Sequence, residues 1–314
     1  MTVPTLKLSD GRTVPALAWG NGSGNARKTP IESGALAIKA GIRHIDTAQG
    51  YENEQETGQS LEKGTKDAGI SVQDIFLTTK LSTEKGDPNK PGIALEDLRD
   101  SVKQSIARLG RQPDLLLIHN PFVAPEGRLV EFWKILEDMK DDGSLTASLG
   151  VSNFRPQDFE ALLPHCRHKP TVNQLEYHPY VLSHLDRVLS LMAEHDIRPA
   201  AYGPMSPVLR HPSKTGGPIG PLLDRAAARL ARESGTEVDA AMVCLLFCRA
   251  KGVIAVSASA NPANIEKLAR TQSLPDLTND EVNEIEQTAR KFHFQAYDEH
   301  MSVDYPAPNL AQGN

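Results

Sequence analysis

The sequence predicts an α/β fold: a (β/α)8 barrel with an N-terminal β-hairpin and a long irregular C-terminal tail. From residue 30 onward, helical and strand-like segments alternate with little interruption. The strand-like segments are short apolar runs, typical of strands covered on both faces in a parallel sheet. The length, 314 residues, is normal for one such barrel. Because no shift in composition marks a boundary, we expect one domain, residues 1–314.

The N-terminal segments are expected to lead into the barrel. Residues 7–14 predict a hairpin around Asp10 and Gly11, a dipeptide that suits a tight turn. Residues 16–19 predict the first barrel strand. The following glycine-rich segment, NGSGN, lacks the GxGxxG spacing of a dinucleotide-binding loop and the Lys-Ser/Thr of a phosphate-binding loop. We interpret it as a flexible loop at the barrel rim, and the missing GxGxxG also argues against an open doubly wound sheet.

The other strands each follow a helical segment. Strands are expected at residues 43–46, 75–80, 114–119, 147–152, 171–176, 199–202 and 253–256. Helices are expected at residues 31–40, 54–63, 95–109, 129–141, 156–163, 183–194, 222–233, 238–250 and 280–292. Segments rich in proline and glycine, residues 80–92 and 205–220, and the tail from residue 293 to 314 are expected to be irregular.

Composition excludes several classes of partner. A net charge of −6 provides no basic face for nucleic acid or an anionic membrane. The most apolar run, residues 240–248, is far shorter than the roughly 20 residues that span a bilayer. The N-terminus has no apolar signal core. We expect a cytoplasmic protein, a monomer or weak dimer, that binds neither nucleic acid nor membrane.

The cysteines do not predict a metal site. Cys244 and Cys248 lie four residues apart, but their surroundings are apolar and no histidine is near, so we interpret them as buried inert thiols. Cys166 lies between His165 and His168, without a second group of ligands.

Four polar residues lie at or near the ends of adjacent predicted strands. Asp46 ends the second strand, Lys80 the third and His119 the fourth, while Tyr51 follows the second. Taken singly, they could be a helix cap, a solvated lysine, a core-edge histidine and a packing residue. Because the carboxyl ends of barrel strands form one face, we expect them to share a pocket. A buried phenol can donate a proton if a nearby cation lowers its pKa from about 10.

Around these positions the chain resembles the aldo-keto reductases. The resemblance covers nearly the whole chain and is carried by GIRHIDTAQGYENE, FLTTK, SVKQSIARLGRQPDLLLIHNP, GVSNF, VNQLEYHP and AYGP. It implies NAD(P)H-dependent reduction of a small carbonyl compound to an alcohol. Tyr51 would be the proton donor, with its pKa lowered by Lys80. Asp46 would hold the charge of Lys80, and His119 would position the substrate carbonyl. The chemistry fits, because an alkoxide formed by hydride arrival needs a proton and a positive field.

The same resemblance implies the residues that bind the nicotinamide. Ser152, Asn153 and Gln174 would hydrogen-bond its carboxamide, which offers both a donor and an acceptor. Tyr202 would stack on the ring. Taken alone, Ser152 or Asn153 could equally cap a helix.

The adenosine end departs from the family pattern. After the last strand the family usually has a Lys-Ser pair, then an arginine and a Glu-Asn pair. The closest pattern is that of a fungal subgroup that reduces α-keto amides and conjugated polyketones, with Lys-Pro-x-Arg in this place; HNPFV also resembles that subgroup. Asn261 and Asn264 stand where its lysine and arginine would hold the 2′-phosphate of NADPH.

Two charge-assisted hydrogen bonds, each worth about 1.5–3 kcal/mol, are therefore missing. Lys267, Arg270 and the hydroxyls of Ser257 and Ser259 are candidate substitutes. We expect NADP(H) to be preferred, with reduced discrimination against NAD(H).

The substrate is expected to be an aldehyde, an α-keto ester or amide, or a diketone. Candidate walls of its pocket are Trp19, Asn120 and Phe122, together with the tail residues Phe292, Phe294 and Tyr297, although aromatic residues could equally serve packing.

Two other functions are compatible with parts of the pattern. One is a barrel that binds a nicotinamide nucleotide as a regulatory or sensor subunit, which would not need the proton donor. The other is a metal-dependent hydrolase, which needs several His, Asp or Glu at strand ends. Here only Asp46, His119 and Glu176 qualify, which argues against a metal site.

Overall fold

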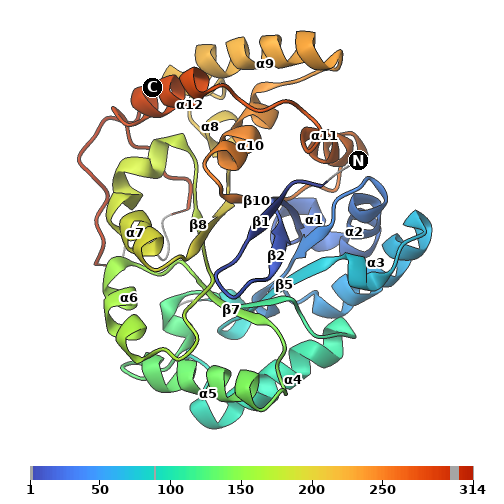
Figure 1. The fold of residues 1–314 in the computed structure, drawn as a ribbon, viewed down its shortest axis with the longest axis vertical. Helices are drawn as coiled ribbons and strands as arrows, with labels where there is room; N and C mark the ends of the chain where they lie inside the picture. Colours follow the sequence, from blue (N-terminus) through green and yellow to red (C-terminus); the bar gives the residue numbers. More distant parts are fainter. Residues whose placement is uncertain (1–2, 88–89, 298–303, 314) are drawn as a thin grey trace.

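The computed structural model describes residues 3–87, 90–297 and 304–313. In this part of the chain eight parallel strands close into a barrel, as predicted (Figure 1). They follow one another around the barrel in chain order, and the last pairs with the first. The strands are β3 (Leu17–Gly20), β4 (His44–Asp46), β5 (Phe76–Leu81), β6 (Leu115–Ile118), β7 (Ser148–Ser152), β8 (Val172–Glu176), β9 (Arg198–Tyr202) and β10 (Ile254–Ser257).

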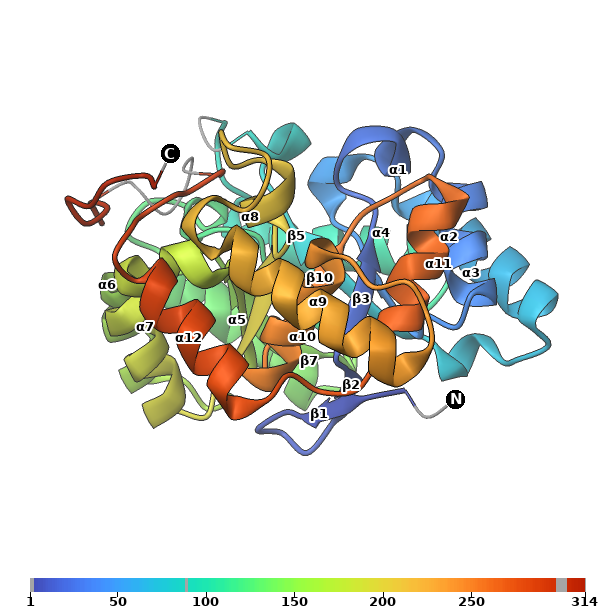
Figure 2. The same ribbon diagram turned by 90° about the horizontal axis from the view of Figure 1, so that it is seen from above.

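Helices surround the barrel (Figures 1 and 2). The longer helices are α2 (Pro30–Lys39), α3 (Glu54–Ala68), α4 (Leu98–Leu109), α5 (Leu129–Asp141), α6 (Pro156–Leu162), α7 (Leu182–Glu194), α9 (Gly220–Ser234), α10 (Ala240–Ala250), α11 (Pro262–Thr271) and α12 (Asn279–Ala289). Two short helices are α1 (Gly24–Lys28) and α8 (Ser206–Leu209). No helix of the described residues is long and apolar enough to cross a membrane.

The predicted hairpin is present and closes one end of the barrel. Strands β1 (Thr5–Lys7) and β2 (Thr13–Pro15) pair antiparallel. Figure 2 shows them at the end of the barrel opposite α1, α8 and the C-terminal tail. Leu8 and Val14 are buried against the inner side chains of the strands. The hairpin thus leaves the carboxyl ends of the strands as the open face.

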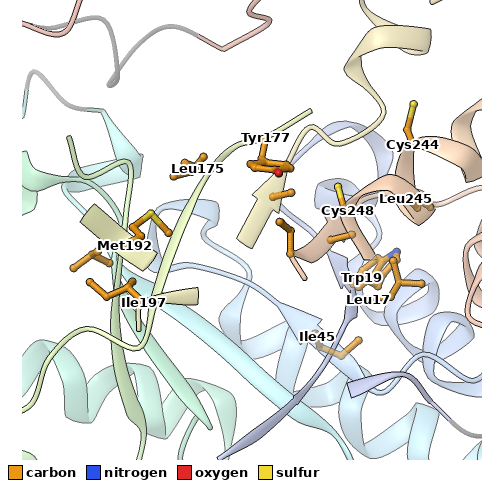
Figure 3. Packing of buried hydrophobic residues seen from close by; sticks show 14 of the residues in the cluster. Leu17, Trp19, Ile45, Leu175, Tyr177, Met192, Ile197, Cys244, Leu245 and Cys248 are labelled. Atoms are coloured by element: carbon orange, nitrogen blue, oxygen red, sulfur yellow. The ribbon is translucent and has the colours of Figure 1, made fainter. Parts of the chain in front are cut away.

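Side chains alternate between the barrel interior and the helices, because successive residues of a strand point to opposite faces. The inner apolar cluster contains Phe76, Leu115, Leu117, Val172, Ala200 and Ile254. A larger cluster lies between strands and helices, and Figure 3 shows part of it, including Leu17, Trp19, Ile45, Leu175 and Cys248.

The cysteines are buried as predicted on α10. Cys244 and Cys248 are fully buried in the outer cluster, and burial raises the pKa of the Cys244 thiol to about 12. Cys166 is half-buried, and its thiol donates to the carbonyl of Leu162 at 3.4 Å. These thiols are therefore poor nucleophiles at neutral pH.

Three α-helices among the described residues were not predicted. Helix α1 begins inside NGSGN, so the flexible-loop interpretation is wrong for its second half. Asn21 in the first half is buried, and its side chain donates to the Thr57 hydroxyl at 2.7 Å. Helix α8 lies within the segment predicted to be irregular. Helix α11 starts directly after β10, where Asn261 caps it and proline occupies the first turn.

The C-terminal tail is irregular where described, as predicted; its residues 298–303 and 314 lie outside the described part. Glu176, at the end of β8, accepts hydrogen bonds from the backbone N–H groups of Ala296 at 2.8 Å and Tyr297 at 2.9 Å. The buried carboxylate therefore fastens the tail to the open face of the barrel.

Candidate active site

The carboxyl ends of the strands surround a cavity of about 420 Å³. Predicted site residues from six strands or their following loops contribute to its wall. They are Asp46, Tyr51, His119, Ser152, Asn153, Gln174, Tyr202 and Ser257.

Lys80 is fully buried and joins Asp46 to Tyr51, two residues that line this cavity. Its Nζ is 2.5 Å from Asp46 Oδ1, 3.0 Å from the carbonyl of Thr47 and 3.3 Å from Tyr51 Oη. Strand register produces this meeting, because Asp46 pairs with Thr78 and Lys80 lies two residues further on the same inward face. The structure therefore brings together the acid, the cation and the phenol that the strand ends predicted.

Close backbone packing positions Tyr51 on a 3-10 turn, η1 (Gln49–Tyr51). A Cβ added to Gly22 would lie 2.6 Å from Cζ of the Tyr51 ring, and one added to Gly50 would lie 2.8 Å from Cα of Gly86. Arg27 of α1 donates from Nε to the Tyr51 carbonyl and from Nη2 to the Gly50 carbonyl, both at 3.1 Å. The tyrosine therefore has a fixed backbone in a crowded position.

The electrostatics differ in one respect from the prediction. Burial raises the pKa of the Tyr51 phenol, and the charge of Lys80 opposes this without reversing it. Burial lowers the pKa of Lys80, but Asp46 and Tyr51 more than offset it, so the net pKa is raised. The expected lowering of the phenol's pKa by Lys80 is thus outweighed by desolvation. At neutral pH the structure holds a protonated phenol beside an ammonium.

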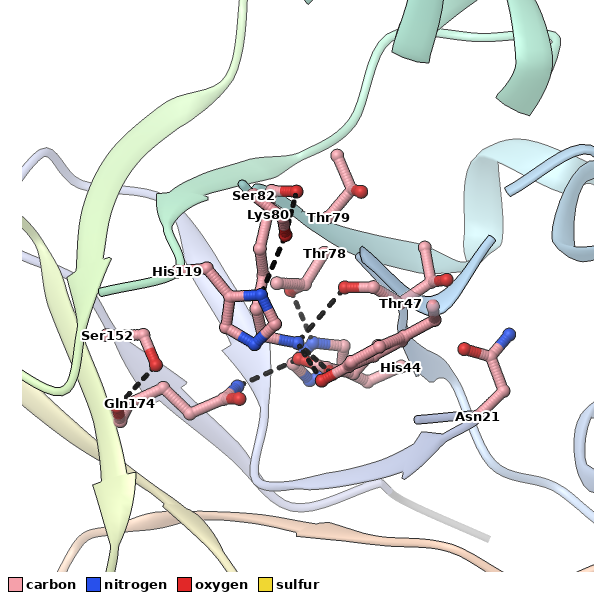
Figure 4. Close-up of polar contacts among 12 residues, drawn as sticks. Asn21, His44, Thr47, Thr78, Thr79, Lys80, Ser82, His119, Ser152 and Gln174 are labelled. Atoms are coloured by element: carbon pink, nitrogen blue, oxygen red, sulfur yellow. Dashed lines mark hydrogen bonds and ion pairs between the residues drawn. The ribbon is translucent and has the colours of Figure 1, made fainter. Parts of the chain in front are cut away.

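His119 lies beside the phenol and contacts a residue that was not predicted. Its Nδ1 is 2.7 Å from the hydroxyl of Ser82, and its ring meets the Tyr51 ring edge-on with centroids 5.5 Å apart. Figure 4 shows Lys80, His119 and Gln174 pointing into the same space. Ser82 could have been found from its spacing, because it lies two residues after Lys80.

Gln174 and Ser152 extend the network across the barrel. Gln174 Nε2 donates to Asp46 Oδ2 at 2.8 Å, and the Ser152 hydroxyl donates to the Gln174 carbonyl at 2.7 Å (Figure 4). Both carboxylate oxygens of Asp46 therefore have a donor within the site.

Asn153 and Tyr202 form the opposite wall. Tyr202 Oη donates to Asn153 Oδ1 at 2.8 Å, and Asn153 Nδ2 donates to the His119 carbonyl at 3.1 Å. The N-cap of the following helix α6 is Arg155, so the alternative interpretation of Ser152 or Asn153 as its cap is wrong.

The predicted adenosine end lies after β10 and is exposed. Asn261 Oδ1 accepts from the N–H groups of Ala263 at 2.9 Å and Asn264 at 3.4 Å, so its side chain serves as the cap of α11. The Ser259 hydroxyl accepts from the N–H of Asn261 at 3.1 Å. Lys267 Nζ is 3.0 Å from Asp239 and 3.5 Å from Glu237. Its charge is therefore already paired.

The predicted substrate walls need correction. Trp19 is fully buried on the outer face of β3 and donates to the Ser259 carbonyl at 2.8 Å. Its neighbour Gly20 faces the cavity, and strand alternation directs Trp19 the other way. Asn120 is buried and caps its own turn by accepting from the N–H of Phe122 at 2.9 Å. The prediction that Trp19, Asn120 and Phe122 line the cavity is therefore wrong.

The aromatic contacts explain where the other candidates lie. Phe122 lies 5.3 Å from the guanidinium of Arg155. Phe294 is buried between the rings of His178 and His211. Tyr297 does line the cavity, where its ring meets that of Tyr202 edge-on. The sequence missed the cations of the wall: Arg27, Lys85 and Arg210.

In the described residues no three His, Cys, Asp or Glu side chains gather as a metal site. Glu176, considered as a metal ligand, instead accepts from the tail and from His178 Nε2 at 2.9 Å. The metal-dependent hydrolase interpretation has no ligand set in this part of the chain.

Comparisons with known proteins agree with this geometry. The model of the Aldo/keto reductase family matches residues 16–290. Aldo-keto reductase family 1 member D1 of Oryctolagus cuniculus is 32% identical over 305 residues, 90% of this chain and 89% of that protein. The NAD/NADP-dependent indole-3-acetaldehyde reductase of Schizosaccharomyces pombe is 28% identical over 303 residues, 93% of this chain and 97% of that protein.

A solved structure extends the similarity to three dimensions. The crystal structure of a Bombyx mori aldo-keto reductase in complex with NADP superposes with a TM-score of 0.80 at 26% identity, covering 98% of this chain and 99% of that one. The matched range includes every barrel strand and the residues around Lys80. The chain therefore belongs to the aldo/keto reductase family.

Proposed function

We propose that this protein reduces a small carbonyl compound to an alcohol with NADPH, using Tyr51 as the proton donor. The observation that carries the proposal is the position of the buried Lys80, 3.3 Å from the Tyr51 hydroxyl and 2.5 Å from Asp46. A phenol and an ammonium so placed suit a reaction in which negative charge develops on an oxygen.

The residues divide the work of the reaction. A nicotinamide cofactor, when bound, would supply the hydride for the carbonyl carbon, and the carbonyl π electrons would move to oxygen. Tyr51 donates its proton to that oxygen, giving the alcohol. Lys80 stabilises the phenolate left behind, and Asp46 keeps Lys80 charged by lying 2.5 Å away. His119, with its ring beside the phenol, positions the carbonyl oxygen.

The cavity fits the nicotinamide cofactor in its polar groups. The hydroxyls of Ser206 and Ser257 line the cavity, are buried and have no hydrogen-bond partner among the described residues. Buried polar groups usually have a hydrogen-bond partner, so these two hydroxyls are available to bind a ligand. Ser152, Asn153 and Gln174 are the groups that would hold the carboxamide.

The cofactor preference follows from the other end of the site. We propose that NADP(H) is preferred but weakly discriminated from NAD(H), because Asn261 and Asn264 carry no charge and Lys267 is paired with Asp239. Support comes from relatives: one is named as NAD/NADP-dependent and another was solved with NADP.

For the substrate we propose an aldehyde, an α-keto ester or amide, or a diketone. The motif HNPFV and the segment after β10 support a relation to the fungal subgroup that reduces α-keto amides and conjugated polyketones.

Replacing Tyr51 by phenylalanine tests the proposal. We expect kcat/KM for carbonyl reduction to fall by about 10²- to 10⁴-fold, the usual contribution of a general acid. NADPH affinity, measured by fluorescence titration, should change by less than about threefold, because only a hydroxyl is lost. Tyr177→Phe is the matched control, since Tyr177 is also buried but lies in the outer cluster.

A panel of carbonyl compounds with NADPH and with NADH should accompany the variant. Full activity of Tyr51→Phe would contradict the assignment of the acid. Cofactor binding without turnover of any carbonyl would instead favour a regulatory or sensor role.

A further inference from the structure

We infer that the substrate is a small carbonyl compound carrying an anionic group, a carboxylate or phosphate, which Arg27 and Lys85 bind at the edge of the cavity. The inference rests on the proposed function and narrows its substrate class to carbonyl compounds that also carry an anion. Three features lead to it: the charge of the cavity wall, the donors of the two cations, and the small residues beside Tyr51.

The wall of the cavity is positive although the protein is not. Arg27, Lys85 and Arg210 line it, and among the described lining residues Asp46 is the one acid. Asp46 is already bound by Lys80 and Gln174. The whole chain has a net charge of −6, so this positive wall does not reflect a basic surface. A cleft lined by one sign of charge raises the local concentration of ligands of the opposite sign.

Arg27 has donors left for a ligand. Nε and Nη2 hold the carbonyls of Tyr51 and Gly50, and Nη2 lies 3.7 Å from the exposed carboxylate of Glu52. Nη1 makes no hydrogen bond to any described residue, and the side chain is 39% exposed. Arg27 and Tyr51 line the same cavity, and Arg27 Nε contacts the Tyr51 carbonyl. An anion bound to Arg27 within the cavity would therefore lie on the same side as the phenol.

Lys85 approaches the same turn from the loop after β5. Lys85 precedes Gly86, and the backbones of Gly86 and Gly50 are in close contact. A Cβ added to Gly50 would lie 2.8 Å from Cα of Gly86. Arg27 contacts the carbonyl of Gly50. The two cations therefore flank one residue, Gly50, next to Tyr51. Lys85 is exposed and forms no ion pair with the described residues, so its ammonium remains available.

The wall beside Tyr51 suits a small polar ligand. The lining residues there have no apolar side chain; they are Gly22, Ser23, Gly50 and Gly86. The larger apolar groups of the cavity, such as Met205 and Leu209, come from the loop after β9 instead. A large apolar substrate would find no hydrophobic surface to bury next to the proton donor.

Arg210 belongs to that other side. Its guanidinium lies over the ring of Tyr297 at 4.6 Å, in the loop that follows Tyr202. We therefore assign the substrate anion to Arg27 and Lys85, and Arg210→Met serves as a test of this division.

The experiment uses substrate pairs that differ in charge and share a carbonyl. kcat/KM is measured with saturating NADPH for an α-keto acid and its methyl ester, for aldehydes with and without a carboxylate two or three carbons away, and for glyceraldehyde 3-phosphate and glyceraldehyde. We expect the anionic member of at least one pair to be preferred about tenfold or more, and the carboxylate and phosphate pairs distinguish the source of the charge. The preference should decline as ionic strength rises to about 0.5 M, because both cations are partly exposed to solvent.

The variants Arg27→Met and Lys85→Met report on the ratio of anionic to neutral kcat/KM. We expect each to lower this ratio about tenfold, while Arg27→Lys and Lys85→Arg recover most of it. Arg27 also holds the turn of Tyr51, but a shifted turn slows both members of a pair and leaves their ratio unchanged. Arg128→Met and Lys103→Met, which remove exposed cations elsewhere, are the controls.

Several results would overturn the inference. An unchanged ratio in both variants would do so, as would a wild-type enzyme that prefers the neutral members. A rise in the KM for NADPH with no change in the ratio would show that the two cations serve the cofactor. A fall in the ratio for Arg210→Met alone would place the anion on the other side. No reduction of any compound would refute the proposed function itself, and this inference with it.

Discussion

The two ends of the proposed cofactor site are built in opposite ways. At the nicotinamide end, Asp46, Lys80 and Gln174 are buried and bonded to one another. At the adenosine end, Asn261 is exposed and its side chain caps its own helix, and Lys267 is paired with acids from the N-terminal side of α10.

Because the two ends are built differently, some properties can change without affecting others. Removing one partner of a buried ion pair leaves an uncompensated charge in a dry environment, which is strongly destabilising. Exposed groups that satisfy only local backbone donors carry no such coupling. Chemistry is therefore strongly linked to stability in this barrel, while cofactor preference is linked to stability only through the Asn261 cap of α11.

The largest effect is expected from Lys80→Met. It removes the charge that stabilises the Tyr51 phenolate and leaves Asp46 buried without its ion partner. We expect kcat/KM to fall at least about 10³-fold and the free energy of unfolding to fall by about 3–5 kcal/mol. The measurements are steady-state kinetics and urea unfolding.

The double variant Asp46→Asn/Lys80→Met separates these two losses. It should recover part of the stability, because no unpaired charge remains, but none of the activity. Recovery of activity in the double variant would contradict the role of Lys80 beside the phenol.

The second prediction is that stability depends on pH through a buried histidine near Asp46. His44, two residues before Asp46, is buried with Nε2 2.8 Å from the Thr78 hydroxyl, and burial lowers its pKa to about 4. The folded pKa lies below the unfolded value of about 6.5, so the unfolded chain binds the proton first as pH falls. Stability should therefore decline between about pH 6.5 and about pH 4, by at most about 3 kcal/mol from this residue.

Unfolding by urea at a series of pH values measures the decline. His44→Gln retains hydrogen-bonding capacity but does not titrate, so its stability should vary less between pH 7 and pH 5. Burial also lowers the pKa values of His184 and His293, so these residues add a slope that this variant retains. An identical slope in the variant and the parent would show that His44 does not contribute.

A third prediction restores charge at the exposed end. Asn264→Arg should raise the ratio of kcat/KM for NADPH to that for NADH about tenfold, the lower end of what one charge-assisted hydrogen bond provides. Stability should be unchanged, because the Asn264 side chain forms no hydrogen bond with the described residues.

Asn261→Lys should raise the ratio of kcat/KM for NADPH to that for NADH further, but it should cost about 1 kcal/mol of stability, because it removes the cap of α11. An unchanged ratio in both variants would place the 2′-phosphate elsewhere, and a clear NADH preference in the parent would refute the proposed cofactor.

The sequence predicted most of the fold and the buried end of the site, because both follow from periodicity. Strand ends of a closed barrel meet on one face, so the positions of Asp46, Lys80 and Tyr51 in the sequence predict that they lie together. The lining of the cavity could not be predicted, because the sequence does not show which of Trp19 and Gly20 on β3 points inward. The contact of Arg27 with Tyr51 was also hidden, since a short helix folding back onto a turn leaves no periodic pattern.

The smallest effect tests whether Lys267 can substitute for the missing charges. Asp239 holds Lys267 at 3.0 Å and also caps α10 by accepting from the N–H of Met242 at 3.0 Å. Asp239→Asn retains the cap, because asparagine is an equally good N-cap, but removes the charge that holds the lysine. We expect the NADPH to NADH ratio of kcat/KM to rise about two- to threefold, as an exposed pair is worth less than about 1 kcal/mol. Lys267→Met in the same background should abolish the gain; a gain that persists without the lysine would mean that the lost negative charge of Asp239, and not a freed Lys267, favours the 2′-phosphate.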